Sequence, residues 1–404
     1  MDLKSGYPWW TVRNGLPCQF PPLRSDLRCE VAIIGGGISG ALIADEFAAH
    51  GHEVALVEGR DIGWGSTAAS TALLQYEIDT SMTDLARRYG ERDAVLAYQA
   101  CVEAVGLLRA RAAEVRNVGS ARADSVYYAS KRTHIGSLRA EFELRARHGL
   151  AVQWLDAGAV RAAYGFDAPA AILSKVAARM DPYRMTYRLL ARLRRRGTAV
   201  FDRTTIDGLQ PRSRGVTLRT TDGFRIDARH VVLAAGYENQ RWLGHRVARN
   251  RSSYAFISDP LEDGALGPLA TTLFWETARP YLYLRGSDDG RVLVGGADDA
   301  IDLPARRDRR VDRKSRKLLR QVRALFPELP IQPAFAWAGT FAETADGLPF
   351  FGPHPQHGPR VLFAMAYGGN GIVYSMLGAG LLRALVERRR HPLAALFGFA
   401  RTGA

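Results

Sequence analysis

Residues 31–60, VAIIGGGISGALIADEFAAHGHEVALVEGR, decide the fold of this 404-residue chain. The short apolar, β-branched run at residues 31–34 predicts a strand, and the glycines after it predict a tight turn into a helix. Apolar residues recur at helical spacing from residue 41 to residue 48, Gly51 ends the helix, and residues 54–57 predict a second strand. The stretch is therefore a strand–turn–helix–strand unit.

The turn of this unit carries the G-x-G-x-x-G spacing at Gly35, Gly37 and Gly40. In such a unit the first glycine makes the turn, the second lets a pyrophosphate approach the backbone, and the third lets the helix pack on the strand. Glu58 ends the second strand, where a carboxylate accepts the ribose hydroxyls of an adenine dinucleotide. A lone glycine triplet is typical of ordinary turns, but these parts in register predict dinucleotide binding at a helix N-terminus.

The composition is that of a globular chain, with 47% hydrophobic and 24% charged residues. No run approaches the ~20 apolar residues that span a bilayer, and the first ten residues, MDLKSGYPWW, lack an apolar segment of signal type. We therefore expect a cytoplasmic protein with no membrane span. Cys18, Cys29 and Cys101 lie far apart, with no pair at metal or redox spacing, so we expect reduced thiols and no metal site.

The net charge of +14 raises the question of a polyanionic partner. The basic runs at residues 192–196, 306–317 and 388–391 are not interleaved with the aromatic residues that stack bases. The second run leads into apolar residues at helical spacing, which is typical of the solvated face of an amphipathic helix. Since charge alone predicts only non-specific attraction, we do not expect nucleic acid as a partner.

The loop after the opening unit, DIGWGSTAASTALLQYEID at residues 61–79, is rich in small residues. Such residues let the backbone come close to a flat, polar ligand, and the hydroxyl groups can touch phosphate. The alternative is that the hydroxyl groups only cap the start of a helix. Both interpretations place the loop beside the glycine turn.

Further along the chain the patterns predict helices over residues 82–115, 134–148 and 182–196. Residues 198–206, 215–222 and 224–236 alternate like a three-stranded β segment, and residues 281–296, YLYLRGSDDGRVLVGG, predict a hairpin. The last part contains GTFAETADGLPFFGP at residues 339–353 and a second glycine turn opening a helix, YGGNGIVYSMLGAG, at residues 367–380. Residues 1–28 show no periodicity and form either an ordered arm or a loose extension.

Together these motifs resemble the FAD-dependent amine and amino acid oxidoreductases of the D-amino acid oxidase superfamily. The resemblance rests on GGGISG with Glu58, on GWGSTAAS, DPYRMT and VVLAAG, and on ETADGLPFFG followed by YGGNGI. It implies an α/β fold in which a Rossmann-type FAD-binding domain, like those of glutathione reductase and p-hydroxybenzoate hydroxylase, is interleaved with an α+β substrate domain built on an antiparallel sheet. The implied FAD-binding domain is discontinuous, over residues 1–85, 159–246 and 336–404, and the substrate domain covers residues 86–158 and 247–335.

The resemblance also implies which residues meet FAD, although any one of the glycines can be no more than a turn. The implied contacts are Gly35, Gly37, Ser39 and Gly40 with the pyrophosphate, Glu58 with the ribose, and Gly65, Ser66, Thr67, Ala68 and Ala69 on the flavin side; Ile206 with the adenine, Ala235 and Gly236 nearby; and Gly339, Gly347, Gly368, Gly369, Asn370, Gly371 and Ile372 around the flavin pyrimidine. The helix after Gly371 would point its positive end at the flavin, whose reduced form is anionic.

The chain departs from the family pattern at several positions. GSTAAST contains no histidine and no cysteine follows Cys101, so we expect FAD to be held without a covalent bond. Val373 stands where sarcosine oxidases carry a lysine, which favours a quinone or dye over oxygen as the electron acceptor. The carboxylate-binding arginine expected after the small-residue loop is absent, and Glu77 and Asp79 in its neighbourhood favour a cationic amine over a small amino acid held only by its carboxylate. Arg285 keeps the alternative of an amino acid substrate open.

The implied reaction transfers a hydride from the carbon bearing the amine to flavin N5, giving an imine that water hydrolyses. This chemistry needs a neutral amine and good positioning more than a side-chain base, so the sequence names no catalytic residue. The candidates for substrate binding are Tyr254, Tyr281, Tyr283, Arg285 and Glu77, although strand aromatics are usually core residues. The alternative functions are a basic FAD-fold protein that acts on or binds RNA, and a non-catalytic flavoprotein.

Overall fold

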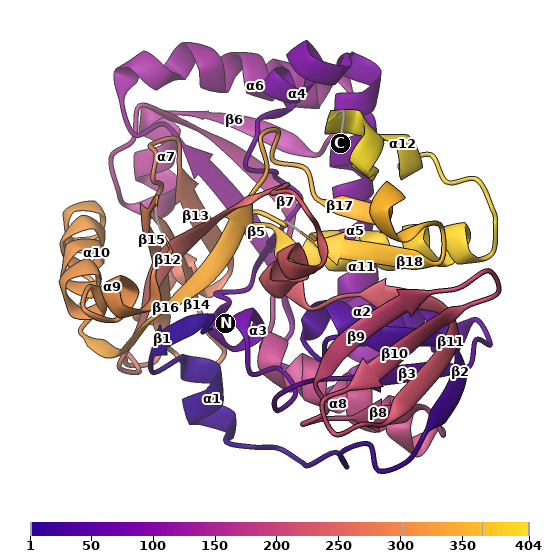
Figure 1. The fold of residues 1–404 in the computed structure, drawn as a ribbon. Helices are drawn as coiled ribbons and strands as arrows, with labels where there is room; N and C mark the ends of the chain where they lie inside the picture. The colour runs from indigo at the N-terminus through magenta and orange to yellow at the C-terminus, as the bar shows by residue number, and fades with distance from the viewer. Residues whose placement is uncertain (1, 301, 366, 403–404) are drawn as a thin grey trace.

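The computed structural model describes residues 2–300, 302–365 and 367–402. Within these residues the strands form an eight-stranded sheet and a ten-stranded sheet (Figure 1). The helices are α1 (Trp9–Asn14), α2 (Ile38–Ala49), α3 (Ser66–Ala69), α4 (Met82–Tyr89), α5 (Glu91–Val115), α6 (Ile135–Arg147), α7 (Ala157–Tyr164), α8 (Pro182–Arg195), α9 (Pro304–Asp308), α10 (Val311–Leu325), α11 (Gly371–Val386) and α12 (Ala394–Phe397).

The eight-stranded sheet is built around the opening unit. β2 (Leu27–Ile34) pairs in parallel with both β3 (Val54–Val57) and β11 (Arg225–Leu233), and α2 connects β2 to β3 as predicted. The sheet continues through β18 (Val361–Met365) to the antiparallel edge strand β17 (Phe350–Pro353). α2 packs between α8 and α11, so the apolar parallel strands are buried beneath helices.

One expectation about this sheet is wrong. β9 (Ile206–Pro211), β10 (Val216–Thr220) and β11 form an antiparallel ribbon, but β8 (Ala199–Phe201), the first of the three stretches, does not join it. β8 pairs in parallel with β3 instead, because α8 carries the chain back across the sheet and Val200 is buried in the core there.

The ten-stranded sheet is mainly antiparallel. In spatial order its strands are β1 (Lys4–Gly6), β16 (Pro333–Glu343), β12 (Arg249–Ser258), β15 (Val292–Asp299), β14 (Tyr283–Gly286), β13 (Thr272–Glu276), β5 (Ala121–Tyr128), β7 (Ala170–Arg179) and β4 (Leu73–Gln75), with β6 (Val152–Asp156) beside β7. β14 and β15 are the predicted hairpin. In Figure 1, α9 and α10 lie on the outer side of this sheet, and the expected α/β class with a parallel and an antiparallel sheet is confirmed.

The predicted helices are present with local breaks that glycine explains. The pattern over residues 82–115 is divided into α4 and α5 at Gly90, whose φ is +86°. Asp181 caps α8, because its Oδ1 accepts a hydrogen bond of 2.8 Å from the N–H of Arg184. No helix in the described part of the chain is both long and apolar enough to cross a bilayer.

The basic run at residues 306–317 is not simply a solvated face, as the sequence suggested. Arg307 is buried and donates hydrogen bonds of 2.7 Å to Ser5 Oγ and 2.8 Å to Asp302 Oδ1. Lys314 reaches Asp299 Oδ1 at 2.8 Å. These two cations are therefore neutralised by acids of the segment just before α9, Asp299 and Asp302.

The N-terminal residues form an ordered arm. β1 extends the ten-stranded sheet by pairing with β16, and the indole N–H of Trp10 on α1 donates to Ser70 O at 2.7 Å. The arm is thereby tied to the small-residue loop. The ten-stranded sheet includes strands from stretches predicted for the FAD-binding domain, namely β1, β4, β7 and most of β16. The domain boundaries stay a prediction.

Candidate functional site

A cavity of about 450 Å³ lies where the two sheets meet. Its walls come from the carboxyl ends of β2, β3 and β11, from the small-residue loop, and from β12, β16 and the start of α11. Ligands of doubly wound sheets bind at the carboxyl ends of the parallel strands, and ligand cavities usually measure ~300–1,000 Å³. The cavity therefore has the place and the size of a cofactor and substrate site.

The glycine turn forms one wall and needs glycine for steric reasons. Gly35 has a φ of +120°, and a Cβ added there would lie 2.4 Å from Ala234 O. A Cβ added to Gly40 would lie 1.8 Å from Gly35 O, so Gly40 permits the close contact between α2 and the turn. Gly35, Gly37 and Ser39 line the cavity, whereas Gly40 does not. The N-terminus of α2 thus opens into the cavity, where its free N–H groups favour an anion.

Glu58 stands beside this turn at the end of β3 and lines the cavity. Its Oε2 accepts a hydrogen bond of 2.7 Å from the N–H of Gly36, and its Oε1 accepts one of 2.8 Å from the N–H of Arg60. Burial raises the pKa of Glu58, and the two N–H groups act against that rise. Arg60 forms an ion pair of 2.6 Å with Glu238, which borders the same part of the cavity.

The small-residue loop packs against the turn through a hydroxyl group. Thr67 Oγ1 accepts a hydrogen bond of 2.9 Å from the N–H of Ile38, so this hydroxyl caps α2 and not the short helix α3 to which it belongs. Gly65, Ser66, Thr67 and Ala69 line the cavity, while Ala68 is buried behind them. The loop therefore brings backbone and small side chains to the cavity wall.

The predicted adenine side also lines the cavity, at Ile206, Ala235 and Gly236. The carbonyl oxygen of Ile206 accepts a hydrogen bond of 2.8 Å from Arg241 Nη2, so one of its lone pairs is already used inside the protein. Arg241 and Arg60 both lie at this end of the cavity.

The C-terminal glycine turn forms the opposite wall. The residues that line the cavity here are Gly339, Gly368, Gly369, Asn370, Gly371 and Ile372. Gly347 does not, because it packs on the loop after β4, where an added Cβ would lie 2.3 Å from Thr80 Oγ1. α11 begins at Gly371, and Ser375 Oγ lies 2.7 Å from Ser39 Oγ of α2. Two helix N-termini are thus held side by side at one cavity, an arrangement that could hold an elongated anionic dinucleotide.

Aromatic residues line the other end of the cavity. They are Tyr254, Trp275, Tyr281, Tyr283, Trp337, Phe341 and Tyr367. The ring of Tyr283 lies over Gly295, where an added Cβ would approach the ring to 2.2 Å. Burial raises the pKa of Tyr283 to about 12, so its hydroxyl group stays protonated near neutral pH. The sequence therefore named two aromatic residues that the fold brings together, Tyr281 and Tyr283, with ring centroids 5.6 Å apart. The Tyr254 hydroxyl group instead donates to Asp299 Oδ2, and Lys314 of α10 lies over its ring, so Tyr254 is used inside the protein.

Two other candidates for substrate binding lie in different surroundings from those expected. Glu77 lines the cavity but is buried with Arg145, whose Nη1 lies 3.6 Å from Glu77 Oε1. Burial raises the pKa of Glu77 and Arg145 opposes the rise. Glu77, which the sequence suggested as a partner for a cationic substrate, therefore already lies beside the internal cation Arg145.

Arg285 does not line the cavity. Its guanidinium group donates hydrogen bonds to the backbone oxygens of Thr71 at 2.9 Å and Gly286 at 3.1 Å, and it lies over the ring of Trp10. Burial lowers its pKa to about 9. The N-terminal arm and the small-residue loop pack around the Arg285 side chain. Arg285 therefore binds main-chain oxygens of the protein and not a substrate in the cavity.

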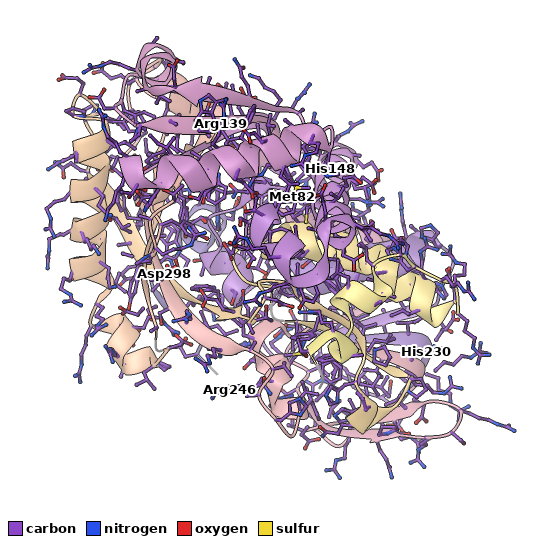
Figure 2. The ribbon with its side chains drawn as sticks, turned by 90° about the horizontal axis from the view of Figure 1, so that it is seen from above. Met82, Arg139, His148, His230, Arg246 and Asp298 are labelled. Carbon is purple, nitrogen blue, oxygen red and sulfur yellow. The ribbon has the colours of Figure 1, made fainter. Side chains whose placement is uncertain are left out.

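Sequence reasoning missed Asp298, which is labelled in Figure 2. Asp298 lines the cavity, and its Oδ1 is buried with no hydrogen-bond partner among the described residues. Burial raises the pKa of Asp298 to about 7, and the nearby Asp79 and Glu343 add to the rise. The two glycines before the acids in GGADD were an available signal, because glycine in a strand often marks a bulge that redirects a side chain.

The described residues contain no group of three or more His, Cys, Asp or Glu that could hold a metal ion. Cys18, Cys29 and Cys101 are free cysteines, and burial raises the pKa of Cys101. The site therefore offers glycine-rich backbone, helix N-termini, carboxylates and aromatic rings as its means of binding.

Comparisons with known proteins give consistent results. A family model described as FAD dependent oxidoreductase matches residues 30–385. The chain is 30% identical over 380 residues to a glycine oxidase of Geobacillus kaustophilus, covering 90% of this chain and 94% of that protein. It is 22% identical over 380 residues to the gamma-glutamylputrescine oxidoreductase of Escherichia coli, covering 91% and 86%. The crystal structure of a Geobacillus kaustophilus glycine oxidase has the same fold, with a TM-score of 0.77 at 23% identity over 92% of this chain and 98% of that one.

Proposed function

Because the chain belongs to the family of FAD dependent oxidoreductases, we propose that FAD lies along the cavity from Glu58 to the aromatic end, where an amine is oxidised. Membership confirms the resemblance seen in the sequence, with FAD as the cofactor and with an amine or amino acid as the class of substrate. The comparisons give no support to the alternative of a protein that acts on RNA.

One observation carries the proposed placement of FAD. The N-termini of α2 and α11 open into the same cavity, and Glu58 lies at one end of it. The N–H groups of α2 would hold the pyrophosphate, Glu58 would accept the ribose hydroxyls, and Ile206, Ala235 and Gly236 would border the adenine. The loop of Gly65 to Ala69 and the turn of Gly368 to Ile372 would enclose the flavin. The glycines that line the cavity fit this role, because they bring backbone to its wall without side-chain bulk.

When bound, FAD supplies the acceptor for the hydride that leaves the carbon bearing the amine. The chain's own residues position the amine and exclude water. Tyr281, Tyr283 and Trp275 border the substrate with their rings, and the hydroxyl oxygens of the two tyrosines accept hydrogen bonds from the ammonium group. The enclosed aromatic end thereby keeps the reacting carbon oriented toward the flavin.

The substrate is proposed to be a cationic amine and not an amino acid held through its carboxylate. The arginines that line the cavity in the described part of the chain are Arg60 and Arg241, and both lie at the adenine end. Asp79 and Asp298 lie at the aromatic end instead. Oxygen or a quinone is the proposed electron acceptor, while the cytoplasmic location and the absence of nucleic acid as a partner stay predictions of the sequence.

Anaerobic titration of the purified protein tests this function. The yellow protein should carry FAD, and n-butylamine or putrescine should bleach the flavin more completely than glycine or sarcosine does. A protein without flavin would contradict the proposed cofactor site. A flavin that none of these compounds reduces would favour a non-catalytic flavoprotein.

A further inference from the structure

We propose that Asp298 binds the ammonium group of the substrate and accepts its proton before the amine is oxidised. This inference rests on the proposed function and assigns a catalytic residue that the sequence did not name. Asp298 is well suited to the task because a buried carboxylate oxygen without a partner is rare in folded proteins and calls for a ligand. The ligand must be a hydrogen-bond donor, since an ionised carboxylate only accepts.

A β-bulge presents Asp298 to the cavity. In the pairing of β12 with β15, Tyr254 faces Gly296 and Ser252 faces Asp299, so β15 contains one extra residue between these pairs. Ala297 takes up this residue with a φ of +53°, a conformation that side chains rarely adopt. Such strain persists where the surrounding structure holds it and is found preferentially near active sites.

The neighbouring residue Asp299 has the hydrogen-bonded and charged partners that Asp298 lacks. Asp299 Oδ2 accepts hydrogen bonds from Tyr254 Oη at 2.8 Å and Arg310 Nη1 at 2.7 Å, and Asp299 Oδ1 accepts one from Lys314 at 2.8 Å. These cations lower the pKa of Asp299 to about 2. Asp299 is a structural ion-pair residue, whereas Asp298 has no ion pair within the described residues and faces the site.

The groups around Asp298 favour a cationic ligand. Asp79 lies on the loop after β4 and Glu343 lies on β16, and their negative charges raise the pKa of Asp298. A hydrogen bond from Ser253 on β12 and the positive charge of Lys314 on α10 lower it. Burial has the largest effect and brings the pKa to about 7. The hydroxyl groups of Tyr281 and Tyr283 are themselves close enough to feel the charge of Asp298. An ammonium group would neutralise this surplus of negative charge.

The proton transfer balances without any other reactant. The substrate enters as R–NH₃⁺, its N–H proton moves to Asp298 Oδ1, and the products are R–NH₂ and a neutral Asp298 carboxylic acid. No bond to carbon is broken in this step, and the nitrogen lone pair becomes available to assist loss of hydride. A carboxylic acid with a pKa near the working pH is efficient in such a transfer, and it can later return the proton to water.

Binding can be separated from oxidation with tert-butylammonium, which has no hydrogen on the carbon bearing nitrogen and cannot be oxidised by hydride loss. Calorimetry on the oxidised holoenzyme should show that tert-butylammonium binds and that pivalate and tert-butanol, of the same shape, bind weakly or not at all. Affinity for tert-butylammonium should rise as the pH rises through about 7, because Asp298 then becomes charged. Asp298→Asn should weaken binding by about tenfold or more and remove this pH dependence.

Stopped-flow reduction with n-butylamine tests the proton transfer. The rate of flavin reduction in the parent enzyme should rise through about pH 7, and this limb should be absent in Asp298→Asn and in Asp298→Ala but partly restored in Asp298→Glu. Asp222→Asn, on the exposed turn between β10 and β11, is the matched control and should behave like the parent.

The outcomes separate the two proposals. Equal affinity for tert-butylammonium and an unchanged pH limb in Asp298→Asn would overturn the role of Asp298 while leaving amine oxidation intact. A parent holoenzyme whose flavin no amine reduces would instead contradict the proposed function. Pivalate binding more tightly than tert-butylammonium would also overturn the inference, because it would show that the site selects an anion.

Discussion

Tyr281 and Asp79 are joined by a hydrogen bond of 2.9 Å from the tyrosine hydroxyl group to Asp79 Oδ1. The other carboxylate oxygen of Asp79 accepts a hydrogen bond of 2.7 Å from the N–H of Gly369. Asp79 therefore ties the glycine turn before α11 to the aromatic end of the cavity. Its charge is partly committed inside the protein, and Glu77 faces Arg145, whereas Asp298 lines the cavity with no ion pair among the described residues.

Asp79→Ala should destabilise the protein by about 1–3 kcal/mol, because it leaves a tyrosine hydroxyl group and a backbone N–H without their acceptor. Urea unfolding of the holoenzyme at pH 7 measures this change. Tyr281→Phe removes only one of the two hydrogen bonds to Asp79 and should lower the free energy of unfolding by less. If Asp79→Ala lowers the free energy of unfolding by less than about 0.5 kcal/mol, the range of ordinary surface substitutions, the hydrogen bonds of Asp79 do not stabilise the fold.

Glu58→Ala should weaken FAD binding by about 1.5–3 kcal/mol, since it removes a charged acceptor for the ribose hydroxyls. The dissociation constant can be measured by adding FAD to apoprotein and following flavin fluorescence. Glu58→Gln keeps the shape of the side chain and should show how much of the loss comes from charge. An unchanged dissociation constant in Glu58→Ala would mean that the ribose lies elsewhere.

FAD should be released completely by acid precipitation. No histidine or cysteine is among the described residues that line the cavity, so the usual partners for a covalent bond to the flavin are absent from its walls. The supernatant should contain all the yellow colour, and its flavin should match FAD by chromatography. Flavin retained in the washed pellet would contradict non-covalent binding.

Reduced enzyme should react slowly with oxygen and faster with a quinone. Val373, which stands where a lysine occurs in sarcosine oxidases, is buried in α11 and does not line the cavity. No lysine lines the described cavity, so the positive charge that assists electron transfer to oxygen is missing near the aromatic end. Stopped-flow mixing of the reduced enzyme with each acceptor measures both rates, and faster reaction with oxygen would disprove the expectation.

Asp298→Asn should stabilise the holoenzyme more at pH 8 than at pH 5. The folded pKa of about 7 lies above the ordinary value of 3.8, so the folded state binds the proton more tightly than the unfolded state. Stability due to this group is therefore lost as the pH rises from about 4 to about 7, and asparagine avoids that loss. Melting temperatures at the two pH values measure the difference. Equal effects of the substitution at pH 5 and pH 8 would mean that Asp298 titrates with its ordinary pKa in the folded protein.

The sequence by itself determined the parts of the protein whose signals are local. The spacing of Gly35, Gly37 and Gly40 and the position of Glu58 depend on one turn and its two strands, and the structure places this unit as predicted. The helix over residues 182–196 and the hairpin over residues 281–296 are likewise present, because periodicity and turn residues encode them within a few positions. The resemblance extended this local information to the family and its cofactor.

Only the tertiary structure decided which charges remain available. Arg145 faces Glu77 although the two residues are far apart in the chain, and Arg285 is used by backbone acceptors of the N-terminal half. Asp298 and Asp299 are neighbours of the same type, yet a one-residue bulge gives one of them three partners and turns the other toward the cavity. Sequence patterns record which side chains exist and how often they recur, whereas the charge that a substrate meets depends on partners brought together from distant segments by folding.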